Sequence, residues 1–299
     1  MKFGRVMTAM ITPFDKEGEV SYERMAELSK YLIENGSDSL LVTGTTGESP
    51  TLTTDEKLKL FETVKRIAVE EGEKLGKKIP VIAGTGSNNT RASIEFTKQA
   101  EKLGMDGALV VVPYYNKPSQ EGMYRHFASI AEASQLPVIM YNIPGRTGVN
   151  MLPETIARLS EHENIVAVKE AAGSLEQVSQ IMQIKAEDFE IYSGDDSLTL
   201  PMLSVGAEGV ISVASHIMGS EINRMCREFF EGNVAEAEAL HRKLYGLFKV
   251  LFVTSNPVPV KYALGKVWKD VGSVRLPLCE MGDGDKAKVD AVLGELGLI

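Results

Sequence analysis

The sequence has no long apolar run, no excess of positive charge and very little cysteine. It contains no stretch of about 18 apolar residues, and no basic segment followed by an apolar one opens the chain; we therefore expect neither a membrane-spanning helix nor a secretory signal. Its 32 basic residues are outnumbered by 41 acidic ones, giving a formal net charge of −9. This charge disfavours nucleic acid and anionic membranes as partners, because both require a basic surface. We expect a cytoplasmic protein.

Cysteine and histidine are too few and too scattered to suggest a metal site. Cys226 and Cys279 lie far apart and form no C-x-x-C pair, so we expect two reduced, buried thiols. The four histidines show no H-x-x-x-H spacing. No glycine motif of the P-loop or dinucleotide-binding type is present. We predict no metal and no cofactor.

What the sequence does contain is a repeated alternation of short β-rich runs with longer segments of helical period. Near-continuous runs of Val, Ile and Leu suit strands that are buried on both faces. The predicted strands are Val6–Phe14, Ser39–Gly44, Pro80–Gly86, Gly107–Pro113, Pro137–Ile143, Ile165–Ala171, Phe189–Gly194 and Gly209–Ser215. The helices predicted between them include Tyr22–Asn35, Thr54–Glu71, Arg91–Leu103 and Glu121–Ala133.

Eight strands and eight helices, counted to about residue 231, predict a (β/α)₈ TIM barrel. An open doubly wound sheet is the alternative, but no G-x-G-x-x-G follows Thr12-Pro13-Phe14 at the end of the first strand. The remaining residues predict two or three more helices, over Val234–Phe252, Pro259–Lys269 and Lys286–Leu296. We therefore expect a catalytic barrel over residues 1–230 and a C-terminal helical appendage over 231–299.

Lys169 is the clearest catalytic candidate. Catalytic groups in such barrels lie at the C-terminal ends of the strands, and Lys169 interrupts an apolar run near the end of the sixth strand. Burial would lower the pKa of its ammonium and free the amine as a nucleophile toward carbonyl carbon. The alternative is a lysine that extends into solvent or pairs with a carboxylate such as Glu170.

Four other residues at this end of the barrel carry suitable polar groups. Tyr141 closes the fifth strand, where a phenol could transfer protons. Arg146 follows in a turn, and its planar guanidinium could bind a carboxylate through two hydrogen bonds. Thr45 and Thr46 lie between glycines after the second strand, where their hydroxyls could bind a carboxylate or relay protons. Each also has an ordinary explanation, as a core tyrosine, a solvated arginine and a capped turn.

Two further pairs are less specific. Tyr114 and Tyr115 follow the fourth strand, where adjacent exposed aromatic residues suit an interface or the rim of a site. Asp195 and Asp196 could be metal ligands or could cap the short helix that follows, and we favour the cap.

Taken together, these motifs resemble those of the pyruvate-dependent class I aldolase family. The motifs are Gly44-Thr-Thr-Gly-Glu48, Tyr141-Asn-Ile-Pro144 with Gly145-Arg-Thr-Gly148, Val168-Lys-Glu-Ala171, Ser193-Gly-Asp-Asp196 and Gly209-Val-Ile-Ser212. They occur in the family's order between about residues 6 and 261. They are most similar to the branch that condenses pyruvate with aspartate 4-semialdehyde, on the route to diaminopimelate and lysine.

The resemblance implies a lyase that works through a lysine Schiff base. Lys169 would form the imine with pyruvate, and the iminium would act as the electron sink without an external cofactor. Tyr141 would donate and accept protons. Thr45 and Tyr115 would complete a hydroxyl relay, with Tyr115 supplied by a neighbouring subunit.

The resemblance also assigns the binding residues. Thr46 and the backbone at Ile211 would hold pyruvate, and Arg146 would bind the carboxylate of the semialdehyde. In the N-acetylneuraminate lyase branch the matching turn typically lacks this arginine. Aldolases of the same family that act on sugar acids are the alternative. A non-catalytic barrel that senses keto acids is a second one, but it would be expected to lack the imine lysine or the relay hydroxyls.

Regulation and assembly follow from the resemblance as well. In members that lysine inhibits, a pocket near the second and third strands carries His and Glu where this chain has Lys57 and Ala92, although Asn88 and Tyr114 fit the sensitive pattern. We therefore expect lysine to inhibit weakly or not at all. The family is usually a homotetramer, a dimer of dimers, and the role given to Tyr115 requires at least a dimer.

Overall fold

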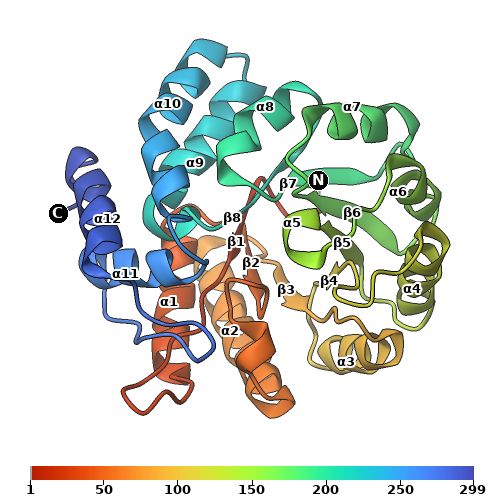
Figure 1. The fold of residues 1–299 in the computed structure, drawn as a ribbon, viewed down its shortest axis with the longest axis horizontal. Helices are drawn as coiled ribbons and strands as arrows, with labels where there is room; N and C mark the ends of the chain where they lie inside the picture. The colour runs from red at the N-terminus through yellow and green to blue at the C-terminus, as the bar shows by residue number, and fades with distance from the viewer. Residues whose placement is uncertain (1) are drawn as a thin grey trace.

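The chain folds into a closed barrel of eight parallel strands, each paired with its neighbours in chain order, with β1 also paired to β8. The computed structural model describes residues 2–299. Figure 1 shows the helices arranged around the outside of the strands, as predicted for a (β/α)₈ barrel. The strands are β1 (Val6–Ala9), β2 (Ser39–Val42), β3 (Val81–Gly84), β4 (Gly107–Val111), β5 (Val138–Asn142), β6 (Ile165–Glu170), β7 (Glu190–Ser193) and β8 (Gly209–Ser212).

Nine α-helices, rather than the eight expected, precede residue 231 in the part of the chain that the structure describes. The extra one is the single-turn α5, which forms in the turn after β5. The helices are α1 (Tyr22–Glu34), α2 (Thr54–Leu75), α3 (Thr90–Lys102), α4 (Gln120–Glu132), α5 (Pro144–Thr147), α6 (Pro153–Ser160), α7 (Leu175–Ile184), α8 (Thr199–Ser204) and α9 (Ser215–Phe230). Two short 3₁₀ helices, η1 (Ser49–Thr51) and η2 (Asp196–Leu198), follow β2 and β7.

Local sequence explains where several helices begin. Ser21 caps α1 by accepting a hydrogen bond from the backbone of Arg24. Thr53 and Glu56 form a reciprocal capping box at the start of α2. Pro153 occupies the first position of α6, where its missing N–H costs nothing.

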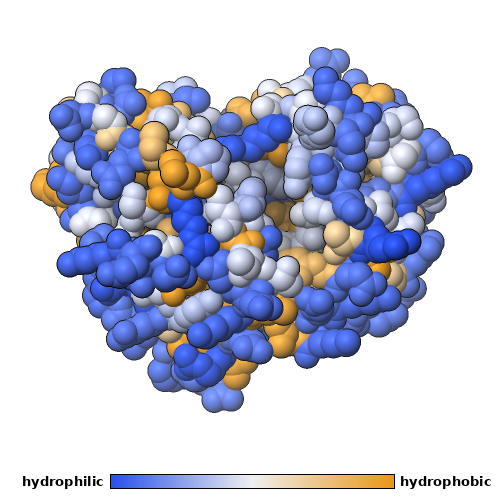
Figure 2. Space-filling view, turned by 60° about the horizontal axis from the view of Figure 1, so that its bottom comes forward, coloured by the Kyte–Doolittle hydropathy of each residue, from blue (hydrophilic) through white to orange (hydrophobic). Residues whose placement is uncertain are grey.

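The apolar core has two layers. One fills the barrel interior and includes Met7, Leu41, Ile82 and Ile139. The other lies between the strands and the surrounding helices. Each strand is therefore buried on both faces, which explains the near-continuous apolar runs in the sequence. The face shown in Figure 2 is mostly hydrophilic and is indented between two lobes.

The first strand is shorter than predicted, because β1 ends at Ala9 instead of Phe14. The apolar residues that follow stay buried but leave the sheet. The backbone N–H of Ile11 donates to His216 Nε2, and that of Phe14 donates to the carbonyl of Val271. Contacts with α9 and the C-terminal segment therefore bury the apolar residues that follow β1.

Three helices follow the barrel, α10 (Val234–Val250), α11 (Val258–Val267) and α12 (Asp283–Glu295). Helices α10 and α11 pack against α9, and α12 packs against α10 and α11. Figure 1 shows the three gathered on one side of the barrel. Cys226 on α9 is buried as expected, but Cys279 is exposed, because it lies in the irregular segment before α12. None of the helices among residues 2–299 is long and apolar enough to cross a membrane.

Candidate active site

Lys169 and Tyr141 lie side by side on β6 and β5, paired in register. The pairing of these strands skips Val166, which forms a β-bulge. Side chains alternate between the two faces of a strand, so an unshifted pairing would set Val168 beside Tyr141. The bulge therefore brings the amine and the phenol together at the C-terminal end of the barrel.

The Lys169 side chain occupies a tight, buried site. Its Nζ lies 4.4 Å from the centroid of the Tyr141 ring, and the residue is only 6% exposed. Gly194, just after β7, leaves room for it, because a Cβ there would lie 3.2 Å from Lys169 Cε. The observed position excludes a lysine that extends into solvent.

Burial lowers the pKa of Lys169 to about 8. The negative charge of Asp196 opposes this shift, and the positive charge of Arg146 adds to it. An appreciable fraction of the amine is therefore unprotonated near neutral pH, as a nucleophile toward a carbonyl requires.

Tyr141 is a neutral phenol in this environment. Burial raises its pKa to about 12, while Arg146 and a hydrogen bond with the Thr45 side chain act in the opposite direction. A protonated phenol beside an amine nucleophile can supply a proton to a departing hydroxyl group. The structure thus connects Lys169, Tyr141 and Thr45 in one group, with the charge of Arg146 acting on the first two.

Glu170 does not pair with Lys169. It occupies the next position of β6, which faces away from the barrel interior. Its carboxylate accepts hydrogen bonds from Asn142 Nδ2 at 3.0 Å, from Gln177 Nε2 at 3.1 Å and from the backbone N–H of Ala172 at 2.7 Å. Burial raises the pKa of this carboxyl group. The alternative of a Lys169–Glu170 ion pair is therefore wrong.

The two aspartates after β7 have different roles. Asp195 caps η2 as predicted, because its Oδ1 accepts from the helix backbone at 2.8 Å. Asp196 was expected to share this role but instead is buried against β8. Its carboxylate accepts from the backbone N–H groups of Val213 and Ala214, both at 3.0 Å, and from the Ser212 hydroxyl. It fixes the end of β8 and places a negative charge near Lys169.

Comparison with known proteins agrees with this geometry. The model of the dihydrodipicolinate synthetase (DHDPS) family matches residues 2–296. The chain belongs to this family. It is 54% identical to the 4-hydroxy-tetrahydrodipicolinate synthase of Heliobacterium modesticaldum, over 100% of this chain and 97% of that one. The Desulforamulus reducens synthase is 55% identical, over 99% and 98% respectively. A crystal structure of DHDPS from Cyanidioschyzon merolae with lysine bound matches with a TM-score of 0.96 at 50% identity, covering 99% of both chains.

Two predicted residues lie outside the cluster around Lys169. Tyr115 is 88% exposed, so this chain does not pack it against Lys169. Its φ of 72° is a strained conformation for a bulky side chain. Arg146 on α5 is exposed to solvent, yet near enough for its charge to lower the pKa of Lys169. Ile211 lies in the barrel interior, in the same apolar cluster as Tyr141.

The sequence did not single out two polar residues, Asn256 and Lys261, that contact the loop carrying Thr45 and Thr46. Asn256 Nδ2 donates to Thr46 Oγ1 at 2.9 Å, and Lys261 forms a buried ion pair with Glu48. Both residues lie far beyond the loop in the sequence, and 210 residues separate Asn256 from Thr46. No local pattern connects such distant positions.

Proposed function

We propose that this chain condenses pyruvate with L-aspartate 4-semialdehyde to give 4-hydroxy-tetrahydrodipicolinate, in the biosynthesis of diaminopimelate and lysine. The observation that carries the proposal is the buried Lys169 amine, with a pKa of about 8, held 4.4 Å from the ring of a protonated tyrosine. Sequence similarity also supports the proposal, because the chain matches 4-hydroxy-tetrahydrodipicolinate synthases over nearly its whole length.

The reaction begins when the Lys169 amine attacks the keto carbon of pyruvate. Loss of water, with a proton supplied by Tyr141, leaves an iminium ion. The iminium draws electrons from the neighbouring methyl carbon, so that a methyl proton passes to the Tyr141 oxygen, which gave up its own proton in the previous step, and an enamine forms. The enamine carbon then attacks the aldehyde carbon of the second substrate, and the aldehyde oxygen takes this proton from Tyr141 to become a hydroxyl group. Attack of that substrate's own amine on the iminium carbon closes the ring and releases Lys169.

The remaining residues bind the substrates and move protons. Thr45, hydrogen-bonded to Tyr141, passes protons between the phenol and solvent. Thr46 and the backbone at Ile211 hold the pyruvate carboxylate. Arg146 binds the carboxylate of the semialdehyde through a charge-assisted pair of hydrogen bonds.

A coupled assay tests the proposed function. Purified protein is mixed with pyruvate and aspartate 4-semialdehyde, and product is followed by NADPH consumption through dihydrodipicolinate reductase. We expect turnover well above the rate without the protein. Absence of product, together with turnover of a sugar acid, would instead favour the sugar-acid aldolase alternative. A keto-acid sensor would bind pyruvate and turn over neither substrate.

The rate of imine formation should increase with pH up to about 8. The reacting form of Lys169 is the free amine, and its fraction grows about tenfold per pH unit below the pKa of about 8, then levels off. Tyr141 stays protonated across this range, since its pKa is raised to about 12. The measurement is the initial rate of borohydride-trapped adduct at low pyruvate between pH 6 and 9. A flat profile from pH 6 to 8 would contradict the proposed nucleophile.

We propose that the protein assembles in the cytoplasm as a homotetramer, a dimer of dimers. The strained and almost fully exposed Tyr115 supports this, because a partner subunit would cover it and bring its hydroxyl to the relay of the neighbouring site. Sedimentation of the purified protein at assay concentrations measures the assembly state. A monomer with full activity would remove the role proposed for Tyr115.

Free lysine is expected to inhibit weakly or not at all. The Lys57 ammonium lies 5.6 Å from the ring of Phe96, and Ala92 on α3 offers no carboxylate to bind the amino group of a ligand. A cation at Lys57 would also repel that group. The measurement is the inhibition constant for L-lysine in the coupled assay. A low-millimolar or tighter constant would refute this expectation.

A further inference from the structure

The loop that carries Thr45 and Thr46 is held in a strained conformation. The residues at its two ends, Thr43 and Glu48, have φ values of 57° and 54°, in the left-handed region that non-glycine residues rarely adopt. The loop is also packed tightly, because a Cβ on Gly47 would lie 3.1 Å from the Thr43 Cα. Such a conformation persists only when surrounding contacts hold it.

The contacts that hold Glu48 come from the C-terminal segment. Glu48 Oε1 lies 2.6 Å from Lys261 Nζ on α11, and the two side chains are 1% and 3% exposed. Glu48 Oε2 accepts a hydrogen bond at 3.0 Å from the backbone N–H of Arg275. Both carboxylate oxygens are thus bound by groups more than 200 residues away along the chain, Arg275 being 227 residues distant.

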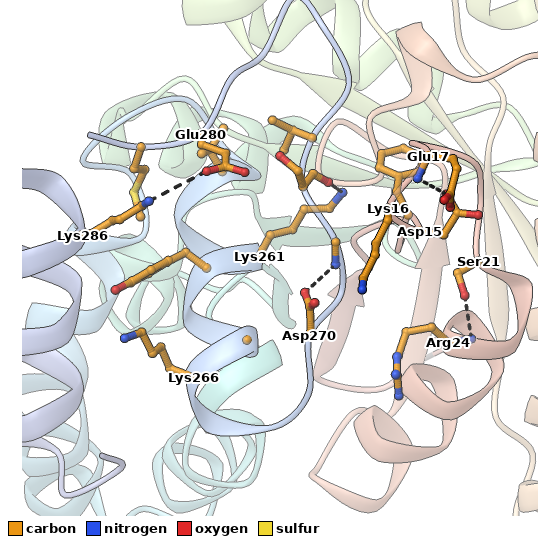
Figure 3. A pocket seen from close by; sticks show the side chains of 18 residues that line it. Asp15, Lys16, Glu17, Ser21, Arg24, Lys261, Lys266, Asp270, Glu280 and Lys286 are labelled. Atoms are coloured by element: carbon orange, nitrogen blue, oxygen red, sulfur yellow. Dashed lines mark hydrogen bonds and ion pairs between the residues drawn. The ribbon is translucent and has the colours of Figure 1, made fainter. Parts of the chain in front are cut away.

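Lys261 is itself fixed from several sides. Its ammonium donates to the carbonyl of Ser273 at 2.7 Å and lies 4.1 Å from the centre of the Phe14 ring. Figure 3 shows its side chain extending from α11, beside a cavity of about 870 Å³ between α11 and the segment after β1. The lysine therefore joins three parts of the chain: the C-terminal segment, the segment after β1 and the loop after β2.

A second contact orients the Thr46 hydroxyl. Asn256 Nδ2 donates to Thr46 Oγ1 at 2.9 Å, and both residues are buried. An oxygen that accepts this bond keeps its own hydrogen for another partner, since a hydroxyl carries one donor and two acceptor sites. Asn256 precedes α11 by two residues, so the segment that supplies Lys261 also directs Thr46.

We propose that Glu48 and Lys261 are positioning residues for pyruvate binding, which fix the loop so that Thr46 presents its hydroxyl hydrogen to the substrate carboxylate. The inference rests on the proposed function. It assigns the C-terminal segment a direct part in substrate recognition, through the ion pair and through Asn256. A group displaced by about 1 Å loses much of its binding or catalytic effect, so a loosened loop should weaken pyruvate binding specifically.

The test is a full-length Lys261→Met variant compared with the unsubstituted protein and with Lys65→Met. Lys65 pairs with Asp106 at 2.7 Å, near the N-terminal end of β4 and away from the reactive lysine. For Lys261→Met we expect the half-saturating pyruvate concentration to rise by about tenfold or more, in both the coupled assay and borohydride trapping. The half-saturating semialdehyde concentration should stay within about twofold. For Lys65→Met we expect a lower melting temperature, with the half-saturating concentrations of both substrates unchanged.

A second variant keeps the test decisive if the single one does not fold. The double variant Glu48→Gln with Lys261→Met leaves no unpaired buried charge, which is the main cost of removing one partner. The double variant should fold, and its half-saturating pyruvate concentration should still be higher than that of the unsubstituted protein. Unchanged pyruvate dependence in a folded variant, with only a lowered melting temperature, would overturn the inference and leave the proposed function intact. If the unsubstituted protein neither traps pyruvate nor turns over, the proposed function itself fails.

Discussion

Replacement of Lys169 by alanine is expected to lower the condensation rate by about a thousandfold or more. The substitution removes the amine that lies beside Tyr141, so the reaction loses its covalent intermediate and the electron sink with it. Pyruvate should also no longer be trapped on the protein by borohydride. Turnover is measured in the coupled assay, and trapping by mass spectrometry.

Alanine at an exposed lysine provides the control. Lys243 lies on the exposed face of α10, and Lys243→Ala should keep full activity and full trapping. The Lys169→Ala protein should remain folded, because it loses a buried ammonium whose charged form burial disfavours. If Lys169→Ala kept more than a tenth of the activity, a different mechanism would be required.

Replacement of Arg146 by alanine should separate the two substrates. Loss of a bidentate charge-assisted contact costs about 2.7 kcal/mol, equivalent to about a 100-fold fall in kcat/KM for the semialdehyde. Binding of pyruvate alone should change much less, because Arg146 lies exposed on α5, outside the buried position of Lys169. Steady-state kinetics with each substrate varied in turn measures both effects.

Arg146→Lys is the matched variant. It retains the charge but loses the planar pair of donors, so its kcat/KM for the semialdehyde should fall between those of the alanine variant and the unsubstituted protein. Removal of the positive charge in Arg146→Ala should also raise the pKa of Lys169 slightly. Unchanged semialdehyde kinetics in Arg146→Ala would show that another group binds the acceptor carboxylate.

The barrel was predictable because its signals are local. Apolar runs, helical periods and capping residues such as Thr53 each occupy a few adjacent positions, and these predicted α1, α2 and α4 to within about four residues of their observed ends. The first strand was predicted too long, because the apolar character of Ile11 and Phe14 reflects contacts with α9 and the C-terminal segment rather than a place in the sheet.

The arrangement of the active site was only partly predictable. The end of β6 identified Lys169, and the end of β5 identified Tyr141. Their proximity depends on the bulge at Val166, which no residue type in the run marks. A shift of one residue in the pairing reverses which side chains share a face of the sheet. The register of the strands therefore determines which side chains meet in the site, and the amino-acid composition of a strand does not reveal that register.

The supports of the Thr45–Thr46 loop could not be predicted at all. Glu48 was visible as part of a motif, but its partners Lys261 and Arg275 belong to a segment whose packing is set by tertiary structure. Asp196 was similarly misread as a helix cap, because its bonds at the end of β8 depend on the pairing of β7 with β8.

Borohydride reduction in the presence of pyruvate, followed by peptide mapping, tests the central claim most directly. Two buried lysines, Lys169 and Lys261, have pKa values lowered to about 8, so by pKa alone either could form the imine with pyruvate. Lys261 is held 2.6 Å from Glu48, whereas Lys169 faces Tyr141. The account predicts a single pyruvate adduct on Lys169. An adduct on Lys261 or elsewhere, or none in a protein that turns over both substrates, would contradict it.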